Sequence, residues 1–129
     1  MIKMDSPDLK HSLPLTPAAF NILLALADGE KHGYAIMQAI ALRTDGEVRM
    51  GPGTLYGLIK RMLADGWIEE LDERPDPALD DERRRYYRLS DLGQRVAAAE
   101  AERLARLVAA ARQQGLLPSK GRAIQLNLP

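Results

Sequence analysis

The stretch TLYGLIKRMLAD, residues 54–65, separates cleanly into two sides when it is placed on a helical wheel. One side is apolar and would attach the helix to a core; it consists of Leu55, Leu58, Ile59, Met62 and Leu63. The other side carries hydroxyl, small and basic residues, namely Thr54, Tyr56, Gly57, Lys60 and Arg61. No carboxylate follows until Asp65, the last residue of the stretch.

A helix that enters the major groove of DNA needs a surface of this kind. Cations meet phosphates, hydroxyls bond phosphates or base edges, and a glycine permits close approach. The free N–H groups of the helix N-terminus can also hold a phosphate. The alternative is an ordinary amphipathic surface helix, because Lys and Arg are common on solvated faces.

The surrounding elements favour the first interpretation. Thr16 and Pro17 predict the start of a helix that ends at Asp28-Gly29, and His32-Gly33 opens a second helix that ends near Thr44. After the third helix, two strand-like runs at 67–71 and 84–89 flank a proline-containing loop. This order predicts a mainly α fold with a small β-hairpin, a winged helix-turn-helix domain over residues 15–90, preceded by an arm at 1–14.

The loop between the two strands has an uneven charge distribution. Residues 65–82 contain nine acidic residues and one basic residue, whereas Arg83, Arg84, Arg85 and Arg88 follow directly. We expect Arg83, Arg84 and Arg85 to contact the DNA backbone while the acidic tip points away. The alternative is that the acidic residues pair with these arginines within the chain.

A long helix is predicted over residues 91–114, with a tail at 115–129. Its apolar side is too long for the small domain to bury, so it predicts a homodimer; a monomer with the helix folded back on its own core is the alternative. Glu100 and Arg103 interrupt that side and can pair with each other or with a partner. The expected dimerisation residues are Leu92, Val96, Leu104, Leu107, Val108 and Ala111.

Composition argues against several other classes of function. Eighteen basic residues balance eighteen acidic ones, so a DNA-binding surface must come from local segregation of charge. The chain has no cysteine, and His11 and His32 lack spaced ligand partners, so we expect no metal site, no cofactor and no enzyme activity. Without a run of about 20 apolar residues or an apolar leader, we expect a cytoplasmic protein with no membrane association.

The segment from Leu15 to Arg103 resembles the PadR family of bacterial transcriptional regulators. The matching pieces follow in the expected order: Leu15-Thr16-Pro17, His32-Gly33-Tyr34, Gly53-Thr54-Leu55-Tyr56, Asp65-Gly66-Trp67-Ile68-Glu69, Arg84-Arg85-Tyr86-Tyr87-Arg88-Leu89-Ser90 and Gly93. The resemblance implies a homodimer that binds an operator and usually represses transcription. It also implies dimerisation through the C-terminal helix and, in some members, binding of a small-molecule effector.

The sequence therefore predicts a sequence-specific regulator that binds double-stranded DNA, with Tyr34 as either a core support or a contact to phosphate. The long helix has no aromatic residue between Asp91 and Gln114, which speaks against a planar ligand stacked at the dimer centre. A smaller ligand in an aliphatic pocket stays open. The alternative function is a winged-helix adaptor that binds another protein and no operator.

Overall fold

A computed structural model describes residues 9, 12–71 and 85–119 of the chain. Three short helices come first: α2 spans Pro17–Ala27, α3 spans Gly33–Arg43 and α4 spans Pro52–Asp65. Thr16 caps α2 as predicted, with its hydroxyl accepting the N–H of Ala19 at 3.1 Å. Gly66 ends α4 in the left-handed conformation, φ 80°, which is open to glycine without strain.

The sheet has one more strand than the sequence predicts. The hairpin strands β2, Ile68–Leu71, and β3, Tyr86–Leu89, pair antiparallel. The short strand β1, Lys31–His32, pairs with the other edge of β3, so the strand order is β1-β3-β2. Two residues show no periodicity, and only the docking of the α2–α3 turn against β3 makes them a strand.

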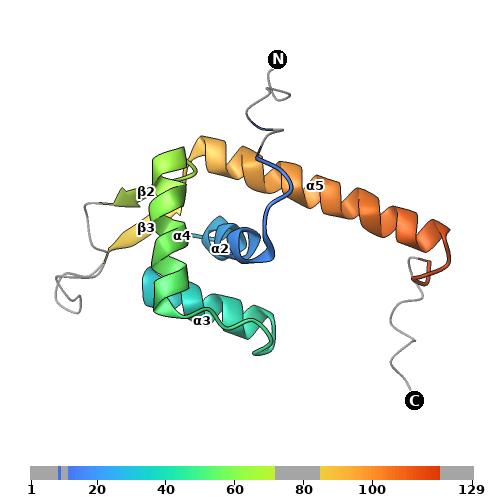
Figure 1. The fold of residues 1–129 in the computed structure, drawn as a ribbon, viewed down its shortest axis with the longest axis horizontal. Helices are drawn as coiled ribbons and strands as arrows, with labels where there is room; N and C mark the ends of the chain where they lie inside the picture. Colours follow the sequence, from blue (N-terminus) through green and yellow to red (C-terminus); the bar gives the residue numbers. More distant parts are fainter. Residues whose placement is uncertain (1–8, 10–11, 72–84, 120–129) are drawn as a thin grey trace.

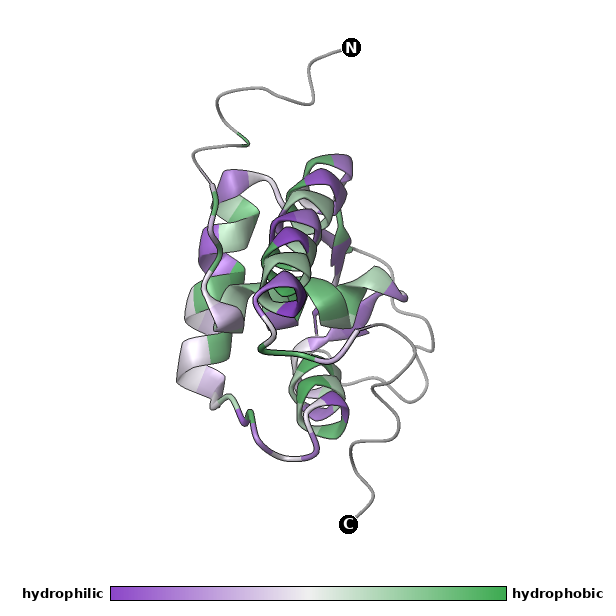
Figure 2. Cartoon of the chain, turned by 90° about the vertical axis from the view of Figure 1, so that its right-hand side faces the viewer, coloured by the Kyte–Doolittle hydropathy of each residue, from purple (hydrophilic) through white to green (hydrophobic). Residues whose placement is uncertain are grey.

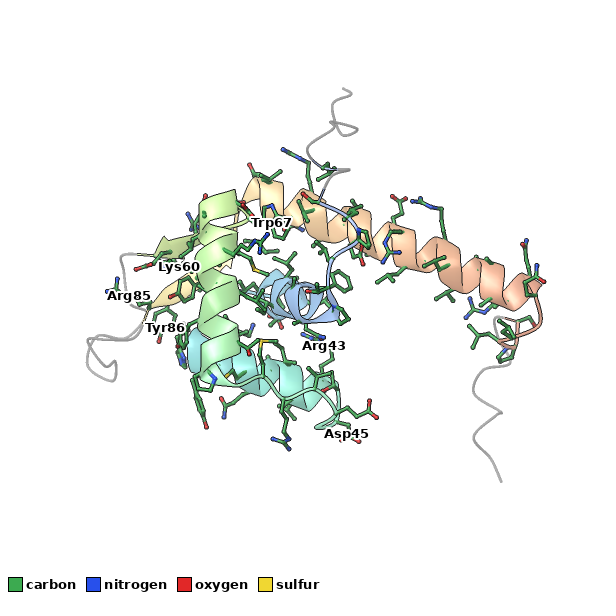
Figure 3. All side chains as sticks on the ribbon, in the orientation of Figure 1. Arg43, Asp45, Lys60, Trp67, Arg85 and Tyr86 are labelled. Atoms are coloured by element: carbon green, nitrogen blue, oxygen red, sulfur yellow. The ribbon has the colours of Figure 1, made fainter. Side chains whose placement is uncertain are left out.

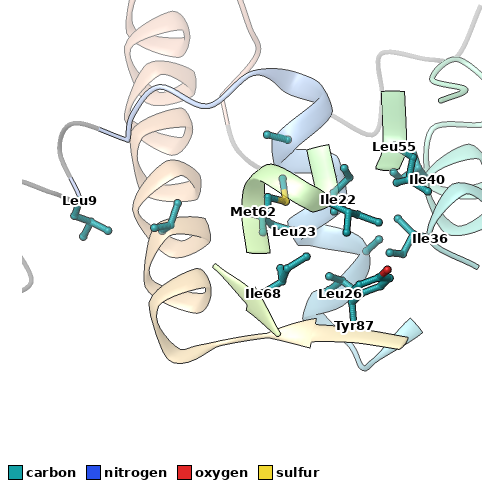
Figure 4. Packing of buried hydrophobic residues seen from close by; sticks show 14 residues of the cluster. Leu9, Ile22, Leu23, Leu26, Ile36, Ile40, Leu55, Met62, Ile68 and Tyr87 are labelled. Atoms are coloured by element: carbon teal, nitrogen blue, oxygen red, sulfur yellow. The ribbon is translucent and has the colours of Figure 1, made fainter. Parts of the chain in front are cut away.

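The core lies between the three helices and the sheet (Figure 4). Ile22 and Leu23 of α2 are at its centre with no exposed surface, and Leu55, Ile59 and Met62 of α4 pack against it. Leu9 also belongs to this cluster, so the predicted arm is not wholly separate from the domain.

The last helix, α5, spans Asp91–Gln113 and projects from the domain as a rod (Figure 1). Its 23 residues correspond to a length of about 35 Å. Figure 2 views the rod from its free end, where both hydrophobic and hydrophilic residues occupy its turns. At this end the chain reverses, and the Arg112 guanidinium donates to the carbonyl of Pro118 at 3.0 Å.

Candidate nucleic-acid interface

The exposed side of α4 is the side that the sequence predicts. Leu55, Ile59 and Met62 are buried, which fixes the rotation of the helix about its own axis. All five residues of the opposite side are exposed: Thr54, Tyr56, Gly57, Lys60 and Arg61. The N-cap residue Gly51 provides no side-chain cap, so the first turn also presents unpaired backbone N–H groups.

Tyr56 has a second role that the helical wheel does not show. A Cβ added to Gly33, the first residue of α3, would lie 2.1 Å from the Tyr56 hydroxyl. The ring is nevertheless 47% exposed. Tyr56 therefore fills the junction between α4 and the start of α3 while keeping one edge on the surface.

The start of α3 carries an aromatic group that sequence reasoning found only in part. His32 caps α3, with its Nδ1 atom accepting the N–H of Ala35 at 3.2 Å. Its ring stacks with Tyr34 at 6.5 Å and meets Tyr86 edge-on at 5.2 Å between centroids. Tyr34 is 57% exposed, which excludes the alternative that it supports the core. The sequence placed His32-Gly33 at the start of this helix but could not show that the His32 ring also meets Tyr86, because Tyr86 is on a strand far away along the chain.

The described arginines of the hairpin are paired with carboxylates on the neighbouring strand. Arg85 donates to Glu70 at 2.6 Å, and Arg88 donates to Glu69 at 3.0 Å. The Glu70 carboxylate raises the pKa of Arg85 above its ordinary value. This supports the alternative of pairing within the chain for the two described arginines.

Arg85 and α4 both lie at the end of the molecule opposite to the projecting rod. Figure 3 shows this for Lys60 on α4 and for Arg85 and Tyr86 at the sheet. Arg83 and Arg84 lie outside the described residues, as does most of the acidic loop. Of the predicted backbone contacts, the structure thus places only Arg85.

The predicted dimerisation residues divide into two groups along α5. Val96 is 1% exposed and belongs to the core of its own chain, so its assignment to a dimer interface is wrong. Leu92 is half-buried and packs against the same core. The cause is the contact of the first half of α5 with α2, which the helical wheel cannot reveal.

Among the residues that the structure describes, none covers the distal half of α5 in this way. Leu107 is 55% exposed and Val108 is 39% exposed. Leu104 and Ala111 on the same side are half-buried. Leu116 and Leu117, just beyond the helix, are also exposed.

Between these halves lies a buried carboxylate. Glu100 is 2% exposed, and the Arg103 guanidinium donates to both of its oxygens at 2.8 and 2.7 Å. The hydrogen bonds from Arg103 lower the pKa of Glu100; burial acts in the opposite direction, and the backbone N–H of Leu15 lowers it further. Of the two pairings left open by the sequence, Glu100 and Arg103 adopt the one within the chain.

The described residues contain no group of three His, Asp or Glu side chains that could hold a metal ion. Within the same part of the chain, no helix combines the length and apolarity needed to cross a bilayer.

Three helices, a three-stranded sheet and an exposed third helix with a cationic side define a winged helix-turn-helix protein. Residues 22–99 match the model of the transcriptional regulator PadR-like family. The chain therefore belongs to the PadR-like family, a family of transcriptional regulators and not of enzymes.

One curated protein matches part of the chain. The chain is 40% identical over 86 residues to an uncharacterized 37.1 kDa protein in a transposon of Streptomyces fradiae. That match covers 67% of this chain but only 22% of the transposon protein.

Solved structures share the fold at lower identity. A transcriptional regulator from Clostridium thermocellum superposes with a TM-score of 0.62 at 23% identity, covering 84% of this chain and 95% of the other. The PadR protein of Bacillus subtilis, solved in complex with operator DNA, gives a TM-score of 0.55 at 20% identity. That alignment covers 65% of this chain and 47% of the Bacillus protein.

Proposed function

We propose that this protein is a homodimeric, sequence-specific DNA-binding regulator that represses transcription by occluding a promoter in the cytoplasm. The observation that carries the proposal is the exposed side of α4, where hydroxyls, a glycine and two cations follow one another without a carboxylate until Asp65. Such a surface suits the floor of a major groove.

The remaining DNA contacts come from the elements beside α4. Tyr34, held by His32 at the start of α3, offers its hydroxyl to a phosphate. Arg85, and with it Arg83 and Arg84, would contact the backbone beside the groove. The Bacillus subtilis PadR structure, which has the same fold and contains operator DNA, supports the proposal that this chain binds DNA.

The symmetry of the operator follows from the dimer. The apolar distal half of α5, with Leu104, Leu107, Val108 and Ala111, would be covered by a second copy of the chain. Two-fold symmetry then requires a palindromic operator. Its half-sites would be separated by a whole number of turns of the DNA helix, each about 34 Å long. A small-molecule effector could relieve repression by changing the angle between the two domains.

Binding and its salt dependence test this function together. Duplexes recovered from a random pool by the purified protein should bind with an affinity that falls steeply as salt rises. Lys60→Ala or Arg61→Ala should reduce that affinity and lower the salt slope by about one, without unfolding the protein. Arg95→Ala, an exposed cation on α5, is the matched control and should leave binding unchanged.

The adaptor is the alternative outcome of this experiment. The ion pairs Arg85–Glu70 and Arg88–Glu69 make the described part of the hairpin less cationic, which favours a protein partner over DNA. Failure of the wild-type protein to bind any duplex at low salt would support the adaptor and refute the DNA-binding proposal.

A further inference from the structure

We propose that Glu100 is a positioning residue that fixes the direction of α5 relative to the DNA-binding domain and thereby the spacing of half-sites that a dimer accepts. The spacing part of this inference rests on the proposed function; the geometrical part does not. Nothing in the DNA-binding or dimerisation surfaces requires a buried carboxylate at this position.

Several contacts attach α5 to the domain. At its start, Gly93 lies directly against the backbone carbonyl of Trp67, just after α4. Leu92 and Val96 then pack against or within the core. Seven residues beyond Gly93, about 10 Å along the axis, Glu100 is the last buried residue of the helix. Because this contact lies farthest from Gly93, it has the most leverage on the direction of the rod.

At Glu100 the helix meets the segment before α2, where the backbone N–H of Leu15 lowers the pKa of the carboxylate. Leu15 precedes Thr16, the N-cap of α2, and the segment before α2 crosses α5 in Figure 1. Helix α2 contributes Ile22 and Leu23 to the core against which α4 packs. The direction of α5 is therefore coupled, through Leu15 and α2, to the position of α4.

The chemistry of the contact makes it specific in direction. Glu100 is 2% exposed, and Arg103, one turn further along α5, donates to both of its oxygens and so orients the carboxylate. A buried ion pair contributes little net stability compared with apolar side chains, and its best-attested role is to select one arrangement over others. Beyond Arg103 the helix leaves the domain, so a change in its tilt displaces each residue more the farther it lies along the rod.

The lever arm is large enough to matter for DNA. From Gly93 to Gln113 the helix is about 30 Å long, and a tilt of about 10° moves its far end by about 5 Å. One base pair separates half-sites by about 3.4 Å. Loss of the contact at Glu100 should therefore widen the range of half-site spacings that the dimer binds by more than one base pair.

The direction of α5 can be tested without DNA by measuring a distance between two labels. Because the chain has no cysteine of its own, labels can be attached at introduced cysteines alone. Nitroxide labels are attached at Ala64→Cys and Gln113→Cys, two exposed positions at the ends of α4 and α5. Labelled chains are diluted with unlabelled protein, and the distance distribution is measured by pulsed electron resonance. We expect a narrow distribution in the wild type, broadened by roughly 5 Å in Glu100→Gln.

Glu102→Gln, an exposed carboxylate on the same helix, is the matched control and should keep the narrow distribution. An unchanged distribution in a folded Glu100→Gln protein would overturn the proposal. If Glu100→Gln fails to fold, Arg103→Gln, whose side chain is 31% exposed, replaces it with the same expectation.

The effect on half-site spacing is measured with the palindromic duplex that the wild type binds best. Its centre is shortened or lengthened by one and by two base pairs, and a duplex with a single half-site is added. The wild type and Glu102→Gln should lose about tenfold or more in affinity on a two-base-pair change, and Glu100→Gln less than about threefold. A uniform loss on every duplex, including the single half-site, would show that Glu100 serves stability alone. A wild type that binds no duplex would refute the proposed function and the spacing claim, while the label distances still decide the geometry.

Discussion

Gly93 on α5 lies against the carbonyl oxygen of Trp67, so closely that a Cβ at this position would be 1.9 Å from it. The Trp67 oxygen belongs to the backbone and a Cβ would be bonded directly to it, so neither atom could move aside. The backbone N–H of Ser90 also donates to this carbonyl, at 3.0 Å. The junction between the hairpin and α5 therefore has room only for glycine.

Gly93→Ala should accordingly destabilise the protein, by at least about 2 kcal/mol, because the added methyl group forces the helix away from Trp67. The measurement is the free energy of unfolding in urea. Gly57→Ala is the matched control: it is also a helical glycine, nothing lies within 4 Å of its Cβ position, and alanine favours the helix, so stability should rise slightly. Equal effects of the two substitutions would show that the contact with Trp67 is relaxed in solution.

The pair Arg85–Glu70 predicts a gain of binding on removal of a carboxylate. Glu70 competes with phosphate for the Arg85 guanidinium, and its own charge repels DNA. Glu70→Gln should tighten duplex binding by about three- to tenfold at low salt and steepen the salt slope by about one.

Stability should change little, because the Arg85 side chain is 64% exposed and exposed ion pairs contribute little. Arg85→Gln should weaken binding. Fluorescence anisotropy titrations of a labelled duplex measure the affinity of both variants. Weaker binding by Glu70→Gln would mean that the carboxylate orients Arg85 for the DNA instead of competing for it.

The carboxylate of Glu100 predicts a loss of stability in acid. Arg103 lowers its pKa in the folded protein, so the ionised form is favoured by folding. Its contribution is fully present above the unfolded-state pKa, about 4.3, and is lost as the pH falls below that value towards the folded-state pKa. Glu100→Gln should therefore be less stable than the wild type at pH 7, with the difference shrinking below about pH 4.

Urea midpoints between pH 7 and pH 3 measure this difference. Asp28→Asn is the control, because Asp28 also has a lowered pKa but pairs with Lys31 at the surface. A stability gap between Glu100→Gln and the wild type that stays constant over this pH range would contradict the assignment of the effect to Glu100.

The exposed apolar side of α5 predicts a dimer that a charge can break. Leu107→Asp places a carboxylate where a second copy is expected to pack, and it should convert the protein to a monomer in analytical ultracentrifugation. Circular dichroism should show that the domain still folds, since Leu107 is 55% exposed within the chain. Leu42→Asp, at a leucine 81% exposed on α3, is the control and should leave the oligomeric state unchanged. A dimer that survives Leu107→Asp would place the interface elsewhere.

The sequence predicted what depends on local periodicity and capping. The alternation of apolar and polar residues over 54–65 was enough to orient α4, because a helix turns by a fixed angle per residue. Thr16 at the start of α2 was also identified correctly, since a cap acts on its own neighbours. The order of these elements predicted the winged-helix fold.

Only the tertiary structure decided which surface each element meets. The helical wheel of α5 places Val96 and Leu107 on one side, but the contact with α2 buries the former and leaves the latter exposed. In the same way β1 exists because it lies beside β3, Glu100 is buried where α5 lies against the domain, and Arg85 is paired because Glu70 is on the next strand. Periodicity specifies a direction around one axis, whereas burial and pairing depend on the distance to residues far away along the chain.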